Sequence, residues 1–449
     1  MNIRIKNAKI LTMDDTDIRE GEIWVRGDRI TYVGPAAEDE EAHAASSESV
    51  MKDEAMMKHE DMMKHDRAGI SWDRVIDASG NLIMPGFKNA HTHSGMTFLR
   101  SYADDLPLSE WLNKQVFPKE AQLDPDKIYD LSLLAFMEYL TSGITACFDM
   151  YLTPDSIAAA SEDFGFRTVM VGGMNDFSQS LAEQEEWYHK YHGGNLVSYE
   201  LGFHAEYTTS KKLLKGLSEL AHGLKAPVWA HNSETRDEVA GCMSRHGMSP
   251  TQLMDSLGLF DYGGGGYHCI WLSDEDMDIF EGRGLTAVTN PASNLKLASG
   301  IAPTVKLLGR GINLAIGTDG PASNNCLDMF REMFLVTGLA KYREKDAAAM
   351  DAADVLRMAT VGGAKAMNLP DCDVLAAGKK ADLIMIDLHR PNMQPENNIL
   401  KNLVYSGSKE NVKLTMIDGK ILYEDGRFYT GFEPEKVYSR AAEIIQGMG

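Results

Sequence analysis

The chain has 449 residues, of which 44% are hydrophobic and 24% charged, as in an ordinary globular protein. Its formal net charge of −22 argues against a nucleic-acid partner, because affinity for phosphate backbones needs clusters of Lys and Arg. The five cysteines are widely spaced and form no Cys-x-x-Cys pair, so we expect no disulfide framework and a reducing cytoplasm as the compartment. The first residues carry no apolar leader and no run of about 18 apolar residues follows, so we expect neither a signal peptide nor a membrane span.

The beginning of the chain predicts a β meander. Short β-prone runs occupy residues 3–11, and two further runs, 21–25 and 29–34, flank a turn at Gly27. A last short run at 75–77 precedes the turn at 78–80.

Residues 37–70 differ abruptly in composition from what surrounds them. They are rich in acids, and Met-Met-Lys-His-Glu at 56–60 nearly repeats as Met-Met-Lys-His-Asp at 62–66. This charge density favours a low-complexity, exposed insertion between two strands. A copper-scavenging loop is the alternative, because Met and His both bind that metal.

From residue 84 to residue 368, short apolar runs alternate with segments of helical periodicity. The runs are 145–150, 168–171, 198–203, 227–230, 267–270, 285–288 and 313–317. Together with the strand that precedes His91 they make eight β/α units, the number that closes a parallel barrel with helices outside. We therefore predict an α/β protein whose catalytic domain, residues 84–368, is a (β/α)8 TIM barrel.

β character returns after residue 368. Runs at 381–387, 412–417 and 420–423 include Asp-Gly at 418–419, a hairpin signal. We expect residues 1–83 and 369–449 to pair into one small composite β-sandwich domain beside the barrel, with a terminal helix over 433–448. The four glycines at 263–266 lack the Lys-Ser/Thr of a phosphate loop, so we predict a flexible connector there.

Two histidines, His91 and His93, follow the buried apolar segment 81–84 with one residue between them. On a strand, positions i and i+2 face the same side, so both imidazoles could bind one metal ion. Imidazole suits Zn, Fe or Ni.

Four more polar side chains follow apolar runs directly: His204, His231, His268 and Asp319. Alone, each has an ordinary structural interpretation, such as a hydrogen-bonded histidine or a turn aspartate before Gly. The carboxyl ends of barrel strands converge on one mouth, however, and their joint placement favours a shared site.

Three histidines and one aspartate make a plausible mononuclear metal site with a position left for water. We assign His91, His93, His231 and Asp319 as its ligands. A bound divalent metal lowers the pKa of its water from 15.7 towards about 7. Glu234 follows His231 by three residues and could shuttle a proton from that water to a departing amine. The alternative is that Glu234 is the N-terminal acid of a helix capped by Ser233.

The motifs together resemble the amidohydrolase superfamily, and within its ATZ/TRZ-like aminohydrolases the 5′-methylthioadenosine/S-adenosylhomocysteine deaminases. The resemblance spans nearly the whole chain apart from residues 37–70. Its motifs are Pro-Gly-Phe-Lys-Asn-Ala-His-Thr-His (85–93), Ala-Asp-Asp-Leu-Pro-Leu (103–108) with Trp-Leu (111–112), Phe-Pro-Lys-Glu (117–120), His-Asn-Ser-Glu (231–234), Asn-Pro-Ala-Ser-Asn-Leu-Lys-Leu (290–297) and Gly-Thr-Asp-Gly-Pro-Ala-Ser-Asn-Asn (317–325).

The resemblance implies a barrel with a composite β-sandwich and one divalent metal per chain, Zn with Fe as the alternative. It places the same four ligands and makes Glu234 the proton shuttle. His268 would polarise the attacking water, and Asp319 would also accept its proton. The resemblance implies substrate contacts by four side chains, with Glu120 on the ribose hydroxyls and His204 on the heterocycle: Glu120, His204, Trp111 and Ser323.

The implied activity is the metal-dependent hydrolytic deamination of a small adenosine-like nucleoside, releasing ammonia and the inosine analogue. The expected substrates are 5′-methylthioadenosine, adenosine or 5′-deoxyadenosine. Members that take S-adenosylhomocysteine resemble one another in carrying arginines after the strand that begins with Gly-Phe-Arg. Here Gly-Phe-Arg (165–167) is followed by residues 168–180 without an arginine. A carboxylate buried without a cation is costly, so S-adenosylhomocysteine is expected to be a poor substrate.

Other functions stay open. The chain could deaminate another heterocycle, such as guanine, cytosine, a pterin or a triazine. A two-metal amidohydrolase that opens a cyclic amide is disfavoured, because such enzymes resemble this chain but carry a bridging lysine on the fourth strand, and residues 196–203 contain none. A protein of another class, non-catalytic and metal-stabilised, is disfavoured because every assigned ligand and Glu234 are present. The sequence leaves open whether the chain forms a homo-oligomer.

Overall fold

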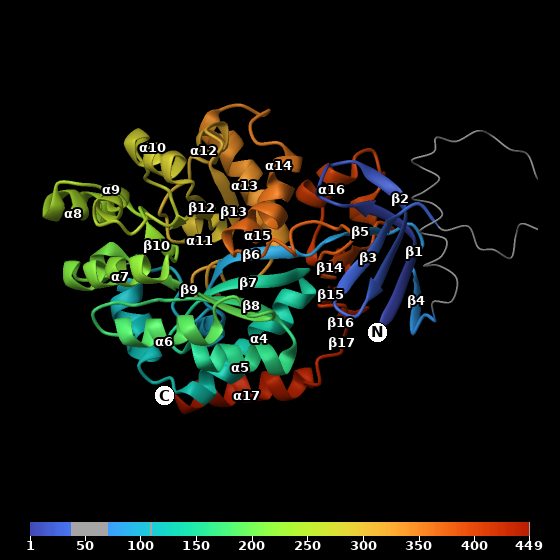
Figure 1. Cartoon of the computed structure of the whole chain (residues 1–449), viewed down its shortest axis with the longest axis horizontal. Coiled ribbons are helices and arrows are strands. Elements are labelled where there is room, and N and C mark those ends of the chain that lie inside the picture. The colour runs from blue at the N-terminus through green and yellow to red at the C-terminus, as the bar shows by residue number, and fades with distance from the viewer. Residues whose placement is uncertain (37–70, 108–109, 449) are drawn as a thin grey trace, which may run out of the picture.

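The computed structural model describes residues 1–36, 71–107 and 110–448 (Figure 1). The insertion predicted over residues 37–70 lies outside the described residues, and so does the copper-binding alternative for it. A parallel barrel wrapped in helices forms one part of the molecule, and a sheet built from both ends of the chain lies beside it (Figure 1).

Nine strands of the described ranges make up the sheet beside the barrel. They are β1 (Asn2–Leu11), β2 (Ile18–Arg26), β3 (Arg29–Gly34), β4 (Arg74–Asp77), β5 (Leu82–Pro85), β14 (Leu383–Ile386), β15 (Val412–Ile417), β16 (Lys420–Glu424) and β17 (Arg427–Phe428). Their order is β17-β16-β15-β14-β5-β1-β2-β3, with β4 beside β1. Strand β5 joins the two ends of the chain, because it pairs with β1 on one side and with β14 on the other. The predicted pairing of the two ends into one sheet is confirmed.

Alternation along β1 explains why this sheet forms. Ile3 and Ile5 are fully buried while Asn2 and Arg4 keep some exposure. The buried face packs in one apolar cluster with side chains of β2 and β14, among them Ile23. A strand with one apolar face needs such a partner layer, and residues from the far end of the chain supply it.

Eight strands within the described ranges form the barrel, in chain order and all parallel. They are β6 (Phe87–Thr92), β7 (Ile144–Met150), β8 (Arg167–Val171), β9 (Val197–Gly202), β10 (Val228–Asn232), β11 (Gly264–His268), β12 (Thr286–Thr289) and β13 (Asn313–Ile316). The circle closes at the carboxyl end of the last strand, where the Asp319 N–H donates to the His91 carbonyl at 2.9 Å. The predicted TIM-type barrel is confirmed.

Helices cover the outside of the barrel (Figure 1). The longer ones are α4 (Pro125–Thr141), α5 (Pro154–Phe164), α6 (Leu181–Tyr191), α7 (Lys211–Leu224), α8 (Arg236–His246), α9 (Pro250–Ser256), α10 (Asp274–Arg283), α13 (Met329–Glu344), α16 (Ile399–Tyr405) and α17 (Pro434–Gly447). Shorter helical turns are η2 (Ser94–Leu99), η3 (Trp111–Val116), α3 (Phe117–Glu120), η4 (Glu206–Thr208), α11 (Pro291–Lys296), α12 (Thr304–Gly309), α14 (Ala352–Arg357), η5 (Met358–Gly362), α15 (Gly363–Ala366), η6 (Pro391–Met393) and η7 (Lys409–Asn411). The predicted terminal helix is α17, which packs against α4.

The barrel interior is filled by large side chains, so it is a core and no channel. Phe148, Trp229 and Tyr267 form part of one buried cluster with Val169 and Val288. Polar side chains therefore gather above this layer, at the carboxyl ends of the strands.

The glycine run before His268 is not a connector, and that prediction was wrong. Gly264, Gly265 and Gly266 lie inside strand β11. A Cβ on Gly264 would come within 2.0 Å of the Val228 carbonyl oxygen, and one on Gly265 within 2.2 Å of the Thr286 carbonyl oxygen. The absence of side chains lets β11 approach both neighbouring strands closely.

A buried ion-pair cluster fastens the barrel to the sheet. Arg167, which opens β8, donates to both carboxylate oxygens of Asp382 (2.6 and 3.1 Å) and to Asp418 Oδ1 (2.5 Å). Lys380 also reaches Asp418 at 3.2 Å. Arg167 thus acts at the amino ends of the barrel strands, opposite the mouth.

All five cysteines are free. Among the described residues, no helix has both the length and the apolar character that crossing a membrane requires.

Candidate active site

A pocket opens at the carboxyl ends of the barrel strands and encloses about 790 Å³ of space, part of it continuous with solvent. Its lining includes all but one of the predicted site residues: His93, His231, Asp319, Glu234, His268, Glu120, His204, Trp111 and Ser323. The exception, His91, lies beneath the pocket and is fully buried.

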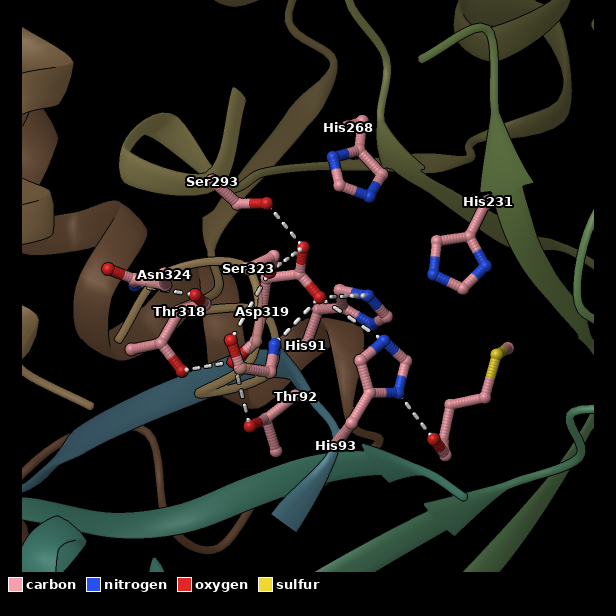
Figure 2. Close-up of polar contacts among 12 residues, drawn as sticks. His91, Thr92, His93, His231, His268, Ser293, Thr318, Asp319, Ser323 and Asn324 are labelled. Carbon is pink, nitrogen blue, oxygen red and sulfur yellow. Dashed lines mark hydrogen bonds and ion pairs between the residues drawn. The ribbon is translucent and has the colours of Figure 1, made fainter. Parts of the chain in front are cut away.

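His91, the last residue but one of β6, is at the centre of the group. It belongs to two overlapping triads of potential metal ligands, His91 with His93 and Asp319, and His91 with His231 and His268. Within each triad the ligand atoms lie within 4.8 Å of one another. Figure 2 shows all five side chains facing one common space. The structure thus brings together the four predicted ligands and His268.

Two of the imidazoles are oriented by backbone carbonyls. His93 Nδ1 bonds to the Met150 carbonyl at 2.5 Å, and His231 Nδ1 bonds to the His204 carbonyl at 2.6 Å. A carbonyl only accepts, so each Nδ1 carries a proton, and Nε2 is the ring nitrogen that remains to face a ligand. This is the usual arrangement behind metal-binding histidines.

The donor set fits a metal ion. Both ring nitrogens of His91 are buried without a hydrogen-bond partner in the described part of the chain, an arrangement that costs free energy unless another group binds them. Asp319 adds a carboxylate, with Oδ1 at 3.2 Å from His93 Nε2 and 3.7 Å from His91 Nε2. Three imidazoles and a carboxylate suit a divalent transition metal.

Asp319 is held firmly, as a ligand should be. Its Oδ2 accepts from Ser293 Oγ (2.6 Å) and Ser323 Oγ (2.9 Å), while Oδ1 accepts from the Gly320 N–H (Figure 2). Burial raises the pKa of Asp319, but the hydrogen bond and charge of His93 outweigh this and hold it well below its ordinary value. The carboxyl group therefore stays ionised.

Two of these residues have strained backbones. Asp319 has a φ of +58° and His268 a φ of +69°, in the left-handed region that such residues seldom adopt. Such strain often accompanies functional sites, where the surrounding structure holds a side chain in place.

Glu234 lies in the loop between β10 and α8 and is buried. Its Oε1 accepts from Ser299 Oγ at 3.1 Å, and its Oε2 lies 3.8 Å from His268 Nε2. Burial raises the pKa of Glu234, which favours a carboxyl that can carry a proton. The alternative of a Ser233 cap is wrong, because helix α8 begins at Arg236 and Thr235 caps it.

A second acid, Glu238, shapes the loop that carries Glu234. Its carboxylate accepts from the backbone N–H groups of Ser233 (3.0 Å), Glu234 (2.7 Å) and Thr235 (3.4 Å). Three donors on one carboxylate fix the backbone on both sides of Glu234. Sequence reasoning missed Glu238, although its spacing of three residues from Thr235 is that of a capping box.

The four predicted substrate contacts all line the pocket. Glu120 ends α3, and burial raises its pKa to about 7, although the Tyr151 hydroxyl and the charge of His93 lower it. His204 is held by Thr208 Oγ1 at 2.8 Å from Nδ1, and burial lowers its pKa to about 4. Trp111 begins η3, while Ser323 already donates its hydroxyl to Asp319. Their roles in binding substrate stay predictions.

Comparison with known proteins agrees with this geometry. The sequence model described as the amidohydrolase family matches residues 82–422. The chain belongs to the amidohydrolase family.

Relatives extend the similarity over the whole amidohydrolase chain. A 5-methylthioadenosine/S-adenosylhomocysteine deaminase of Thermoanaerobacter pseudethanolicus is 36% identical, covering 99% of this chain and all of that protein. A 5′-deoxyadenosine deaminase of Methanothermobacter thermautotrophicus is 40% identical over 79% of this chain and 84% of that protein. The crystal structure of an adenosine deaminase from Xanthomonas campestris with bound zinc is 31% identical, with a TM-score of 0.89 over 100% of this chain and 98% of that one. The resemblance stated from the motifs is confirmed.

Sequence reasoning about this amidohydrolase assigned no role to the residues behind the site, although two of them lie in the motif 290–297. Ser293, Asn294 and Ser299 each bond to a predicted site residue, and they follow strand β12. The signal was available: polar residues follow this strand directly, as they follow the others that carry site residues.

Proposed function

We propose that this amidohydrolase hydrolytically deaminates an adenosine-like nucleoside, releasing ammonia and the corresponding inosine analogue. The observation that carries the proposal is the convergence of His93, His231 and Asp319 beside Glu234 in one pocket, with His91 directly beneath them. Relatives named as deaminases of adenosine-type nucleosides, similar over most or all of their length, support the choice of substrate class.

We infer that one divalent metal, zinc with iron as the alternative, is held by His91, His93, His231 and Asp319. The zinc in the adenosine deaminase from Xanthomonas campestris supports the choice of metal. When bound, such a cation supplies Lewis acidity, which lowers the pKa of a water molecule towards about 7 and makes it a nucleophile at neutral pH.

Glu234 moves the protons that the reaction needs. Its raised pKa lets Oε2 hold a proton and deliver it to the ring nitrogen next to the carbon that bears the amino group. The carboxylate then takes a proton from the attacking water and passes it to the departing amine. His268 Nε2 and Asp319 flank the same space and accept hydrogen bonds from that water.

The charges that line the pocket favour a neutral substrate. Among the described residues that line it there is no Lys or Arg, while Glu120, Glu234 and Asp319 contribute carboxyl groups. A substrate carboxylate there would find no cation to offset its desolvation. We therefore expect 5′-methylthioadenosine, adenosine or 5′-deoxyadenosine to be preferred over S-adenosylhomocysteine.

The test is a substrate panel with purified protein whose metal content has been measured. Ammonia release is followed for the four nucleosides and for guanine, cytosine, a pterin and a triazine. We expect a neutral adenosine-type nucleoside to have the highest kcat/KM. If a free base, a pterin or a triazine has the highest kcat/KM instead, the enzyme acts on another substrate class. No turnover of any compound would favour a non-catalytic binding protein, and S-adenosylhomocysteine well ahead of adenosine and methylthioadenosine would refute the argument from pocket charge.

A further inference from the structure

One segment behind the pocket touches three different groups of the site. It runs from Ser293 in α11 to Ser299, just after the strand β12, and its sequence motif has no role in the chemistry described above. The three side chains that reach the site are all buried.

Each of the three side chains bonds to a different proton-handling group. Ser293 Oγ donates to Asp319 Oδ2 at 2.6 Å (Figure 2). Asn294 Oδ1 bonds to His268 Nδ1 at 2.7 Å. Ser299 Oγ donates to Glu234 Oε1 at 3.1 Å. The groups come from the ends of β13, β11 and β10, so the segment connects three strands.

The segment is itself held in place. The Asn294 N–H donates to the Asn290 carbonyl and the Ser299 N–H to the Asn294 carbonyl, both at 2.9 Å. Trp271 Nε1 donates to the Ser299 carbonyl at 2.8 Å, and the guanidinium of Arg236 lies 4.3 Å from the Trp271 ring. A side chain supported in this way needs little reorganisation when the substrate binds.

The contacts determine which atoms remain for the reaction. Ser299 Oγ donates to Glu234 Oε1. The other carboxyl oxygen, Oε2, lies nearer His268 and is left to carry a proton. Since the Asn294 amide oxygen only accepts, His268 is protonated on Nδ1 and keeps a lone pair on Nε2, which faces the pocket.

We propose that Ser293, Asn294 and Ser299 form one positioning segment that orients Asp319, His268 and Glu234 for proton transfer. The proposal rests on the proposed deaminase function, but it assigns roles to residues that touch no substrate. Its two consequences can be measured separately, one by kinetics and one by metal retention.

The kinetic test uses Ser299→Ala and Asn294→Ala. We expect kcat to fall about 10- to 100-fold, the range for leaving a buried donor or acceptor without its partner, while KM changes less than about twofold. Ser299→Thr keeps the hydroxyl and Asn294→Asp keeps an acceptor, so both should recover at least part of kcat. Ser132→Ala is the matched control, because its buried hydroxyl bonds to the Ile128 carbonyl away from the site.

The metal test uses Ser293→Ala, in which Asp319 loses one of its two serine donors. We expect this variant to lose metal to a chelator several-fold faster than the wild type, whereas Ser299→Ala and Ser132→Ala lose it at the wild-type rate. This readout needs no substrate.

The two tests separate the proposals. A wild-type enzyme that turns over no compound of the panel would overturn the proposed function, whereas Ser293→Ala that retains metal like the wild type would overturn this role of the segment by itself. In an active enzyme, kcat unchanged in Ser299→Ala and Asn294→Ala, or losses that neither conservative variant recovers, would also overturn it.

Discussion

His268 Nε2 lies 3.8 Å from Glu234 Oε2, and the two residues come from the ends of neighbouring barrel strands, β11 and β10. Their positions are fixed by different partners, Asn294 behind the imidazole and Ser299 beside the carboxyl group. His268 Nε2, a hydrogen-bond acceptor, and Glu234 Oε2, which carries a proton, therefore face the same space above His91. Of the two, His268 belongs to one triad of potential metal ligands, whereas Glu234 belongs to neither and so is free to carry a proton without binding the metal.

Replacing Glu234 by Gln should abolish most turnover and leave the metal bound. The amide has nearly the same shape and can still accept from Ser299, but it cannot carry a proton between water and amine. We expect kcat to fall by about 10²- to 10⁴-fold. Ammonia release and metal analysis of the same preparation measure the two effects. Turnover at the wild-type level would contradict both the mechanism and the choice of pocket.

Glu120 should make substrate binding depend on pH. Its pKa is raised to about 7, so the carboxylate forms as the pH rises through about 7 and is lost below it. If the carboxylate accepts from ribose hydroxyls, KM for adenosine should rise several-fold between about pH 8 and pH 6, with a smaller change in kcat. Glu120→Gln should give a high KM that varies little with pH.

The ribose analogue provides the control for Glu120. With 2′,3′-dideoxyadenosine, which lacks both hydroxyls, the wild-type enzyme should lose this dependence of KM on pH. The same dependence with this analogue would show that Glu120 does not bind the ribose.

Much of the site could be predicted because its residues follow a local rule. His231 and Asp319 follow short apolar runs, and parallel strands bring such positions to one mouth whatever the loops between them. The apolar run before His91 instead forms β5 of the other sheet, and His91 lies within β6 itself. The spacing of His91 and His93 was still informative, since their ring centroids lie 4.8 Å apart although β6 ends between them. The barrel itself followed from counting alternating runs.

What escaped prediction depends on contacts between distant residues. The glycines of β11 form a strand that lies close to the backbone carbonyls of Val228 on one side and Thr286 on the other. Nothing in the glycine run itself indicates these neighbours. Ser299 reaches Glu234 across 65 positions of the chain. Loop conformations decide which residues make such contacts, and composition and periodicity do not determine those conformations.

Arg167 should contribute strongly to stability, because it joins barrel and sheet through a buried pair. Arg167→Met leaves the fully buried Asp382 without its main partner, and we expect a loss of about 3–5 kcal/mol in the free energy of unfolding. Adding Asp382→Asn should restore part of it, since the buried carboxylate that lost its partner is then no longer charged. Thermal unfolding followed by calorimetry measures the change.

A surface pair serves as the control for Arg167. Arg440 also pairs with an aspartate, Asp130, at 2.7 Å, but its side chain is 49% exposed. Arg440→Met should cost at most about 1 kcal/mol. Equal losses in the two variants would contradict a special role for the buried pair.

Glu200 should make the protein less stable as the pH rises. It is buried in β9, and burial raises its pKa to about 8, although a hydrogen bond from Asn368 lowers it. In the unfolded chain a glutamate ionises near pH 4.5, so between about pH 4.5 and 8 the folded state holds a proton that the unfolded state has lost. The contribution of Glu200 to the free energy of unfolding is therefore complete below about pH 4.5 and declines as the pH rises to about 8.

Glu200→Gln removes this ionisation and tests the argument. The variant and the wild type should differ little at pH 5, whereas the variant should gain roughly 2–5 kcal/mol relative to the wild type by about pH 9. Melting temperatures measured across this range at constant ionic strength give the difference at each pH. A difference that stays constant between pH 5 and 9 would mean that Glu200 ionises in the folded protein as it does in the unfolded chain, and would contradict the argument.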